Sequence, residues 1–166
     1  MSIVYYANVT VHVLAAMVWL GGMFFLGVVG APLLRGIEPP ELRQKLFTAI
    51  GERFRVVGWL AIGVLVVTGV VNLHYRGWLH WQGVLGSADF WRTGTGRALG
   101  AKLAAVTIMI VVGAVHDFIQ GPRAARAEPG SARALELRRS AALLARVNAL
   151  LGVLLVVAAV RLARGG

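Results

Sequence analysis

The sequence predicts an all-α integral membrane protein, a four-helix bundle with both termini on the outer side of the membrane. Of its 166 residues, 58% are hydrophobic and only 14% are charged, whereas a soluble domain carries roughly 25% charged residues. The apolar residues gather in four runs, and each run reaches the ~20 residues that cross a bilayer core of ~30 Å. We therefore expect a single transmembrane domain over residues 1–166, with spans at about 3–34, 56–75, 99–119 and 141–162.

The segments between these runs predict how the spans are connected. The first run has no positively charged leading segment, so we expect it to be a retained span that is tilted or protrudes, and not a signal peptide. Pro39 and Pro40 predict a break followed by a short amphipathic helix before the second span. The second connection is rich in tryptophan and glycine and predicts an interfacial loop. Gly121–Pro122 and Pro129–Gly130 predict turns in the third connection. No convincing internal repeat is visible.

The distribution of basic residues predicts the orientation. The first and third connections hold eleven Lys and Arg residues, and the opposite side holds five. Because Lys and Arg concentrate in cytoplasmic loops, the first and third connections should face the cytoplasm. The net charge of +10 is then explained by orientation and by contact with anionic lipid. No nucleic-acid partner is expected, because no basic face is interleaved with stacking aromatic residues.

Several classes of chemistry are disfavoured by what the chain lacks. There are no cysteines, which excludes thiolate metal sites, iron–sulfur clusters and a cysteine nucleophile. The sequence also contains no HExxH or phosphate-binding loop motif, which argues against metalloprotease and nucleotide chemistry.

Ionisable residues inside the spans are the candidates for function, because a polar group in hydrocarbon is costly. His12 lies in the first span, on a helical face that should point into the bundle. His74 ends the second span, His80 follows it, and Lys102 lies one turn into the third span. All four lie toward the same side of the membrane and can converge at one depth. The residues of the His12 face follow at spacings of three and four: Tyr5, Asn8, His12, Ala15, Trp19, Gly22 and Met23.

A second group of polar residues is expected at the inner side. His116 and Asp117 are adjacent near the end of the third span, and Arg53 and Arg55 precede the second span. Lys102 and His116 share one helical face but lie about 21 Å apart at 1.5 Å per residue, so they cannot hold one ligand. The simplest interpretation of this inner group is an interfacial pair beside orientation charges.

The outer candidates suit a metal cofactor. Two histidines on facing helices can ligate a heme iron from both sides, and a nearby lysine would neutralise a propionate. Histidine with methionine would also suit copper. His12 and His74 are thus the predicted metal ligands, and Lys102 is predicted to bind the cofactor. The residues assign no catalytic group and leave open whether the protein is an enzyme.

Three stretches resemble the copper resistance protein D family. They are the run from His12 through Trp19 to Gly21–Gly22, the sequence Arg53-Phe-Arg55, and the stretch from Thr93 to Lys102, in which Thr95 stands where tyrosine is usual. The resemblance covers nearly the whole chain. It implies a four-helix module of the bacterial inner membrane that is associated with copper uptake or resistance.

The pattern is also similar to the HemJ-type protoporphyrinogen oxidases. These have a histidine and a tryptophan in the first span, a lysine opening the third, and bound heme b. That similarity implies that His12 and Lys102 bind the cofactor, with Trp19 as a packing partner.

The leading hypothesis is therefore a heme b protein of electron transfer or copper-linked redox homeostasis. The alternatives are a copper-binding or copper-importing protein, a HemJ-type oxidase, and a structural subunit of a larger membrane complex. The expected partners are the lipid bilayer and other membrane subunits or a second copy of the chain.

Overall fold

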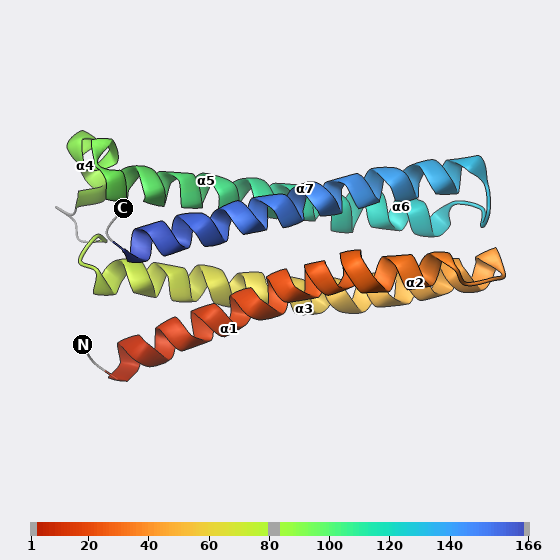
Figure 1. The fold of residues 1–166 in the computed structure, drawn as a ribbon, viewed down its shortest axis with the longest axis horizontal. Coiled ribbons are helices and arrows are strands. Elements are labelled where there is room, and N and C mark those ends of the chain that lie inside the picture. Colours follow the sequence, from red (N-terminus) through yellow and green to blue (C-terminus); the bar gives the residue numbers. More distant parts are fainter. Residues whose placement is uncertain (1–2, 80–83, 165–166) are drawn as a thin grey trace.

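The computed structural model describes residues 3–79 and 84–164, and within them it contains helices and no strand (Figure 1). Four of the described helical segments are long and apolar enough to cross a membrane, which confirms the predicted all-α fold of four spans. Their parts, in chain order, are α1 (Ile3–Phe25), the π-helix η1 (Leu26–Gly30), α2 (Ala31–Arg35), α3 (Pro40–Tyr75), the 3-10 turn η2 (Val84–Gly86), α4 (Ala88–Arg92), α5 (Gly94–Ala114), the π-helix η3 (Val115–Gln120), α6 (Gly121–Arg126) and α7 (Ala132–Ala163).

The first helical segment, Ile3–Arg35, matches its predicted span, whereas the other three extend beyond theirs. The amphipathic helix expected after Pro40 is the first part of α3, because nothing between Pro40 and Tyr75 breaks the helix. α5 begins ahead of its apolar run, where the Thr93 hydroxyl accepts a hydrogen bond from the Gly96 amide at 3.0 Å. Ser131 caps α7 in the same way. These caps satisfy amides at the helix starts, so both helices extend beyond the hydrocarbon-length segment.

The turn expected at Gly121–Pro122 is not formed, and this prediction was wrong. The chain passes from η3 into α6 without leaving helical geometry, and Pro122 lies in the first turn of α6. The π-helical segment η3 directly before it changes the local hydrogen-bond register, and such adjustments accommodate a proline without ending the helix. The actual turn comes later, between Arg126 and Ala132, and contains Gly130 with a positive φ of 79°.

The helices form two antiparallel hairpins that repeat one architecture. In each, a long helix passes through a π-helical segment into a short proline-containing helix, turns tightly, and returns as one uninterrupted helix. The first hairpin is α1 to α3 and the second is α5 to α7. Both termini lie at one end of the molecule, here called the terminal end, and the two tight turns lie at the opposite, turn end (Figure 1). This repeat of structure was not visible in the sequence.

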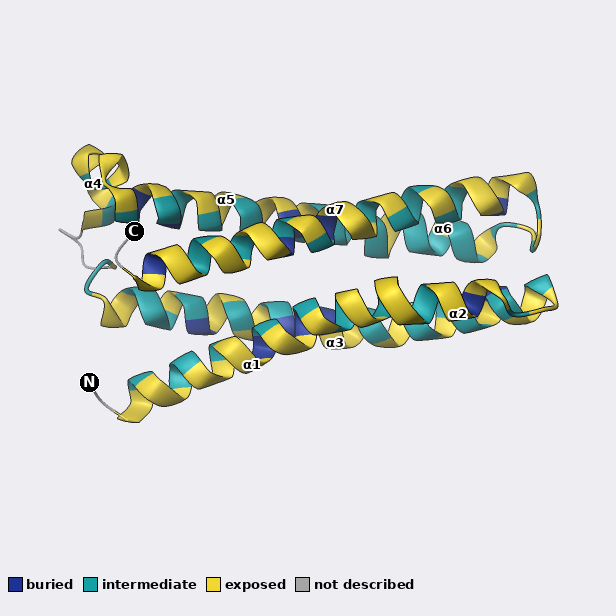
Figure 2. Ribbon diagram, viewed as in Figure 1, coloured by how far each residue is buried: buried dark blue, intermediate teal, exposed yellow. Residues whose placement is uncertain are grey.

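The buried core is small and lies where the two hairpins meet. Trp19, Ala61 and Met109 form its centre, and the Met109 side chain is fully buried. Most outward-facing residues are apolar and exposed (Figure 2), so in a membrane they contact lipid. The partly buried residues around the core are Met23, Ile62, Leu65, Leu151 and Leu155.

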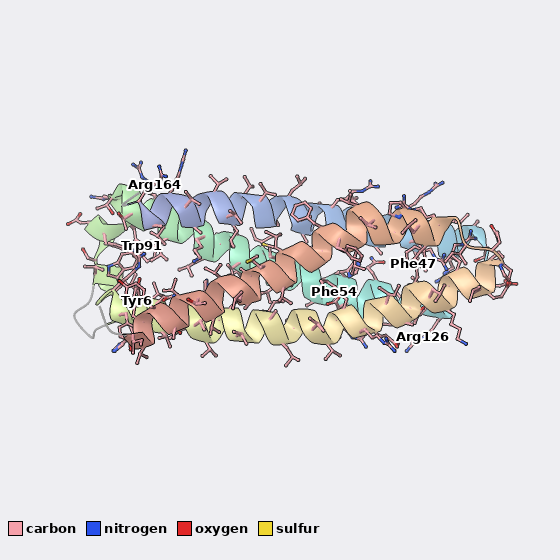
Figure 3. All side chains as sticks on the ribbon, turned by 60° about the horizontal axis from the view of Figure 1, so that its bottom comes forward. Tyr6, Phe47, Phe54, Trp91, Arg126 and Arg164 are labelled. Atoms are coloured by element: carbon pink, nitrogen blue, oxygen red, sulfur yellow. The ribbon has the colours of Figure 1, made fainter. Side chains whose placement is uncertain are left out.

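A buried glutamine joins three elements near the turn end. The Gln44 side-chain amide donates to the carbonyl oxygens of Ala125 at 3.0 Å and Ala127 at 2.9 Å. Its oxygen accepts a hydrogen bond from Arg138 at 2.9 Å. The Arg138 guanidinium also lies 5.4 Å from the centroid of the Phe47 ring. Figure 3 shows Phe47 and Arg126 toward this end, and Tyr6, Trp91 and Arg164 at the terminal end.

Candidate functional site

A ladder of polar contacts joins α1 and α3 near the terminal end. The Tyr5 and Tyr75 rings meet edge to face at 5.5 Å. The Asn8 amide donates to the Asn72 side-chain oxygen at 2.9 Å and to the Thr68 carbonyl at 3.1 Å. The prediction that this face of the first span points into the bundle is therefore confirmed for its residues nearest the terminal end.

His12 is the deepest member of this ladder, and its contacts define its tautomer. Its Nδ1 lies 2.7 Å from the Thr68 hydroxyl, which itself lies 2.6 Å from the Val64 carbonyl oxygen. A hydroxyl has one proton, and here that proton goes to the carbonyl, so Thr68 accepts and His12 Nδ1–H donates. The hydrogen-bond pattern thus leaves the lone pair of a neutral His12 on Nε2, one of the two ring nitrogens through which histidine can ligate a metal.

Lys102 brings positive charge from the other hairpin to this site. It is half-buried in the third turn of α5, as His12 lies in the third turn of α1, so the two residues occupy matching positions of the repeat. The Lys102 ammonium is close enough to interact electrostatically with the His12 ring and with the Arg76 guanidinium at the end of α3. Lys102 beside the imidazole, with Arg76 near Lys102, adds basic groups to a site that would attract anionic groups.

Trp19 lies about 10 Å deeper than His12 along α1, at 1.5 Å per residue. Its side chain is 8% exposed and belongs to the core. A Cβ added at Gly58 would lie 3.7 Å from the Trp19 indole, so the ring covers the α3 backbone there. This placement fits a packing role beneath the site.

The structure places His74 at a different depth from His12. His74 is exposed in the last turn of α3, and its ring lies 6.1 Å from that of Tyr75. It stands about 9 Å beyond Thr68 along the helix axis, whereas His12 contacts Thr68 itself. A shared ligand for the two histidines therefore stays a prediction. His80, the other outer candidate, falls outside the described residues.

The inner polar group is held together by Asp117, in the π-helical segment η3. Its two carboxylate oxygens lie 2.9 Å from His116 Nδ1 and 2.9 Å from the Trp59 indole nitrogen, which donates. Arg55 donates to the Asp117 backbone carbonyl at 3.4 Å. The predicted association of Arg55 with His116 and Asp117 is confirmed, while Trp59 was missed because its distance from Asp117 in the chain gives no sequence signal.

The described residues offer few side chains that could together coordinate a metal ion. Among residues 3–79 and 84–164, no group of three or more His, Asp or Glu side chains could hold a metal ion. A metal bound to this part of the chain would need few protein ligands, as a heme iron does, or ligands of another kind, such as thioethers.

The four membrane-length helices define a multi-pass helical membrane protein. Between them lie two ionisable side chains, His12 and Lys102. The family model "Copper resistance protein D" matches residues 48–162. The chain is also 31% identical over 155 residues to an uncharacterised protein of Aquifex aeolicus (strain VF5), with 93% of this chain and 92% of that protein covered. The chain thus belongs to the copper resistance protein D family and is a copper-resistance-related membrane protein. No solved structure matches it.

Proposed function

We propose that the protein binds heme b through His12 and serves electron transfer or copper-linked redox homeostasis in the bacterial inner membrane. One observation carries the proposal, namely the hydrogen bond from His12 Nδ1 to Thr68. Metal-ligating histidines commonly donate their second ring N–H to an acceptor, which orients the ring and makes the ligating nitrogen more basic. Thr68 supplies that acceptor, with its own proton engaged by Val64.

The surrounding charges support heme over a bare copper ion. Lys102 and, next to it, Arg76 are basic and would disfavour a metal ion that carries no anion of its own. Heme carries two propionates, and Lys102 would neutralise one of them. The iron needs only one or two axial ligands from the protein, which fits a part of the chain without a three-ligand group. When bound, the heme would supply one-electron redox chemistry.

In this proposal each residue has a separate task. His12 is the axial ligand, Thr68 positions its ring, and Trp19 packs beneath the site. His74 is the proposed second axial ligand. We expect its loss to weaken binding or to leave a five-coordinate heme, because His12 would remain as one axial ligand.

The optical spectrum of the purified protein tests the proposal. The protein from heme-sufficient cells should show a Soret band, and His12→Ala should abolish it while the protein stays folded in the membrane. Helix insertion depends on summed hydropathy, which alanine preserves. His116→Ala is the matched control, because it removes a histidine about 21 Å from the depth of Lys102. A Soret band that persists in His12→Ala, or disappears in His116→Ala, would refute the assignment.

Copper binding is the second candidate, and family membership favours it. The same Nε2 of His12 would then bind the metal. A colourless protein that holds stoichiometric copper and loses it in His12→Ala would select this function. Oxidation of protoporphyrinogen by the purified protein would instead select the oxidase alternative. A colourless, metal-free protein that co-purifies with other subunits would select a structural role.

A further inference from the structure

A groove lined by basic and polar side chains lies between the third and fourth helical segments near the turn end. Its volume is about 480 Å³, and it is formed by the end of η3, by α6 and by the first turns of α7. On each wall the lining residues follow at steps of three and four, so each helix presents one face to the groove. These residues are Gln120 and Arg123 on one wall, and Arg133, Glu136, Leu137 and Ser140 on the other.

The two arginines of the groove are available to a ligand. Arg123 and Arg133 are both exposed, and neither belongs to an ion pair among the described residues, although Glu136 lines the same groove. Two arginines and one glutamate give the groove a formal charge of +1. The planar guanidinium fork matches the oxygens of a phosphate group through paired N–H bonds. The groove is therefore suited to a phosphate-containing anion.

An unsatisfied amide adds to these charges. The Gln120 Oε1 atom is buried and has no hydrogen-bond partner among the described residues. A buried polar atom in this state calls for a partner from outside the chain. Gln120 lies one turn before Arg123, and the Ser140 hydroxyl lines the opposite wall. A polar headgroup in the groove would thus meet an amide, a hydroxyl and two guanidinium groups.

The position of the groove along the helices matches the headgroup region of a membrane. Gln120 directly follows Ile119, the last residue of the predicted third span, which is exposed. On α7, the exposed Leu143 lies one turn from Ser140 in the direction of the membrane interior. Apolar surface therefore borders the groove toward the hydrocarbon, and the arginines lie toward the water. A phospholipid, with its charged head and apolar chains, matches both borders.

We propose that this groove binds the headgroup of one anionic phospholipid, phosphatidylglycerol, with its phosphate held by Arg123 and Arg133. Basic pockets between membrane helices are suited to anionic headgroups. A lipid of charge −1 neutralises the groove, whereas a zwitterionic lipid leaves its excess charge uncompensated. The headgroup hydroxyls of phosphatidylglycerol can donate to Glu136. The groove lies at the turn end and His12 near the terminal end, so this proposal does not depend on heme binding.

The test is native mass spectrometry of the full-length protein in detergent, titrated with dioleoylphosphatidylglycerol or dioleoylphosphatidylethanolamine. The first phosphatidylglycerol should bind about fivefold tighter than phosphatidylethanolamine. Replacing both Arg123 and Arg133 with glutamine should weaken its binding about 25-fold, at about fivefold for each arginine.

A second double variant is the matched control. Arg126 and Arg139 are exposed on the same two helices but do not line the groove. Replacing both with glutamine removes the same total charge. At an ionic strength of about 0.15 M, charges outside the groove are largely screened, so binding should change by less than about twofold.

Gln120→Leu separates recognition from folding. It removes an amide oxygen that is buried without a partner, so the free energy of unfolding of the lipid-free protein should stay the same or rise. Binding of phosphatidylglycerol should nevertheless weaken about threefold, because one hydrogen-bonding group of the groove is lost. Parent-like binding in this variant would overturn the role of the amide.

Three results would overturn the groove as a lipid site. Equal losses in the Arg123/Arg133 and Arg126/Arg139 double variants would show a general attraction of charge. Equal affinity for the two lipids would show that the headgroup charge is not recognised. Displacement of phosphatidylglycerol by inorganic phosphate at equal concentration would show a site for free anions in place of a lipid.

Discussion

Replacing Gln44 with methionine should destabilise the protein by about 3 kcal/mol, as its contacts indicate. The side chain makes two hydrogen bonds to backbone carbonyls and accepts one from the charged Arg138. Neutral hydrogen bonds contribute about 1 kcal/mol each, and those to charged groups about 1.5–3 kcal/mol. Arg138 is only half-buried, so water recovers part of the third bond and the total stays near the lower sum. Methionine keeps the length of the side chain, so little packing is lost.

The assay is the free energy of unfolding in mixed micelles titrated with a denaturing detergent and followed by tryptophan fluorescence. Lys45→Met is the control, because Lys45 is exposed on the neighbouring position of α3 and should change stability by less than about 0.5 kcal/mol. Arg138→Met combined with Gln44→Met should cost less than the two single changes together, since the residues share a bond. A Gln44→Met protein as stable as the Lys45→Met protein would refute the reasoning.

Three other predictions follow from the same contacts. Thr68→Val keeps the volume but removes the acceptor of His12 Nδ1–H, so cofactor affinity in a titration should fall about tenfold or more, and an unchanged affinity would contradict the assigned tautomer. Gly96→Ala should cost about 1–3 kcal/mol in the unfolding assay or prevent folding, because its Cβ would lie 2.9 Å or less from backbone atoms of α4. Gly100→Ala, which meets only ordinary contacts with a tryptophan ring, is the control. A cysteine placed at the N-terminus or at Gly165 should react with an impermeant maleimide in intact cells, and labelling only after lysis would reverse the predicted orientation.

The fold was predictable because bilayer thickness sets the length of a span. Hydropathy therefore located all four helices, but it could not locate their ends, which depend on the caps at Thr93 and Ser131 and on the absence of a breaker in α3. The π-helical segments gave no sequence signal, because each covers little more than one turn. The shared architecture of the hairpins rests on these segments, which occupy matching positions in the two halves.

The His12 side of the candidate site could be predicted from the sequence, but its partner on α3 could not. The spacing of polar residues on the first span identified the face that carries His12, since helical periodicity decides which residues point together. The identity of its partner, Thr68, depends on which helix packs against that face. The periodicity of a single helix does not reveal which helix that is. The contact of Asn148 with the Met23 sulfur could not be predicted for a related reason, because it depends on which two helices meet.

The division of polar contacts between the two hairpins has a consequence for how the protein is made. Asn8, His12 and Thr68 find their partners within the first hairpin, so that half can leave the translocon and rest in lipid with these groups satisfied. Asn148, emerging later, meets the sulfur of Met23 only when the halves join. A lone polar amide in hydrocarbon favours association with a partner, and the contact of Asn148 with Met23 therefore favours the joined arrangement of the two halves.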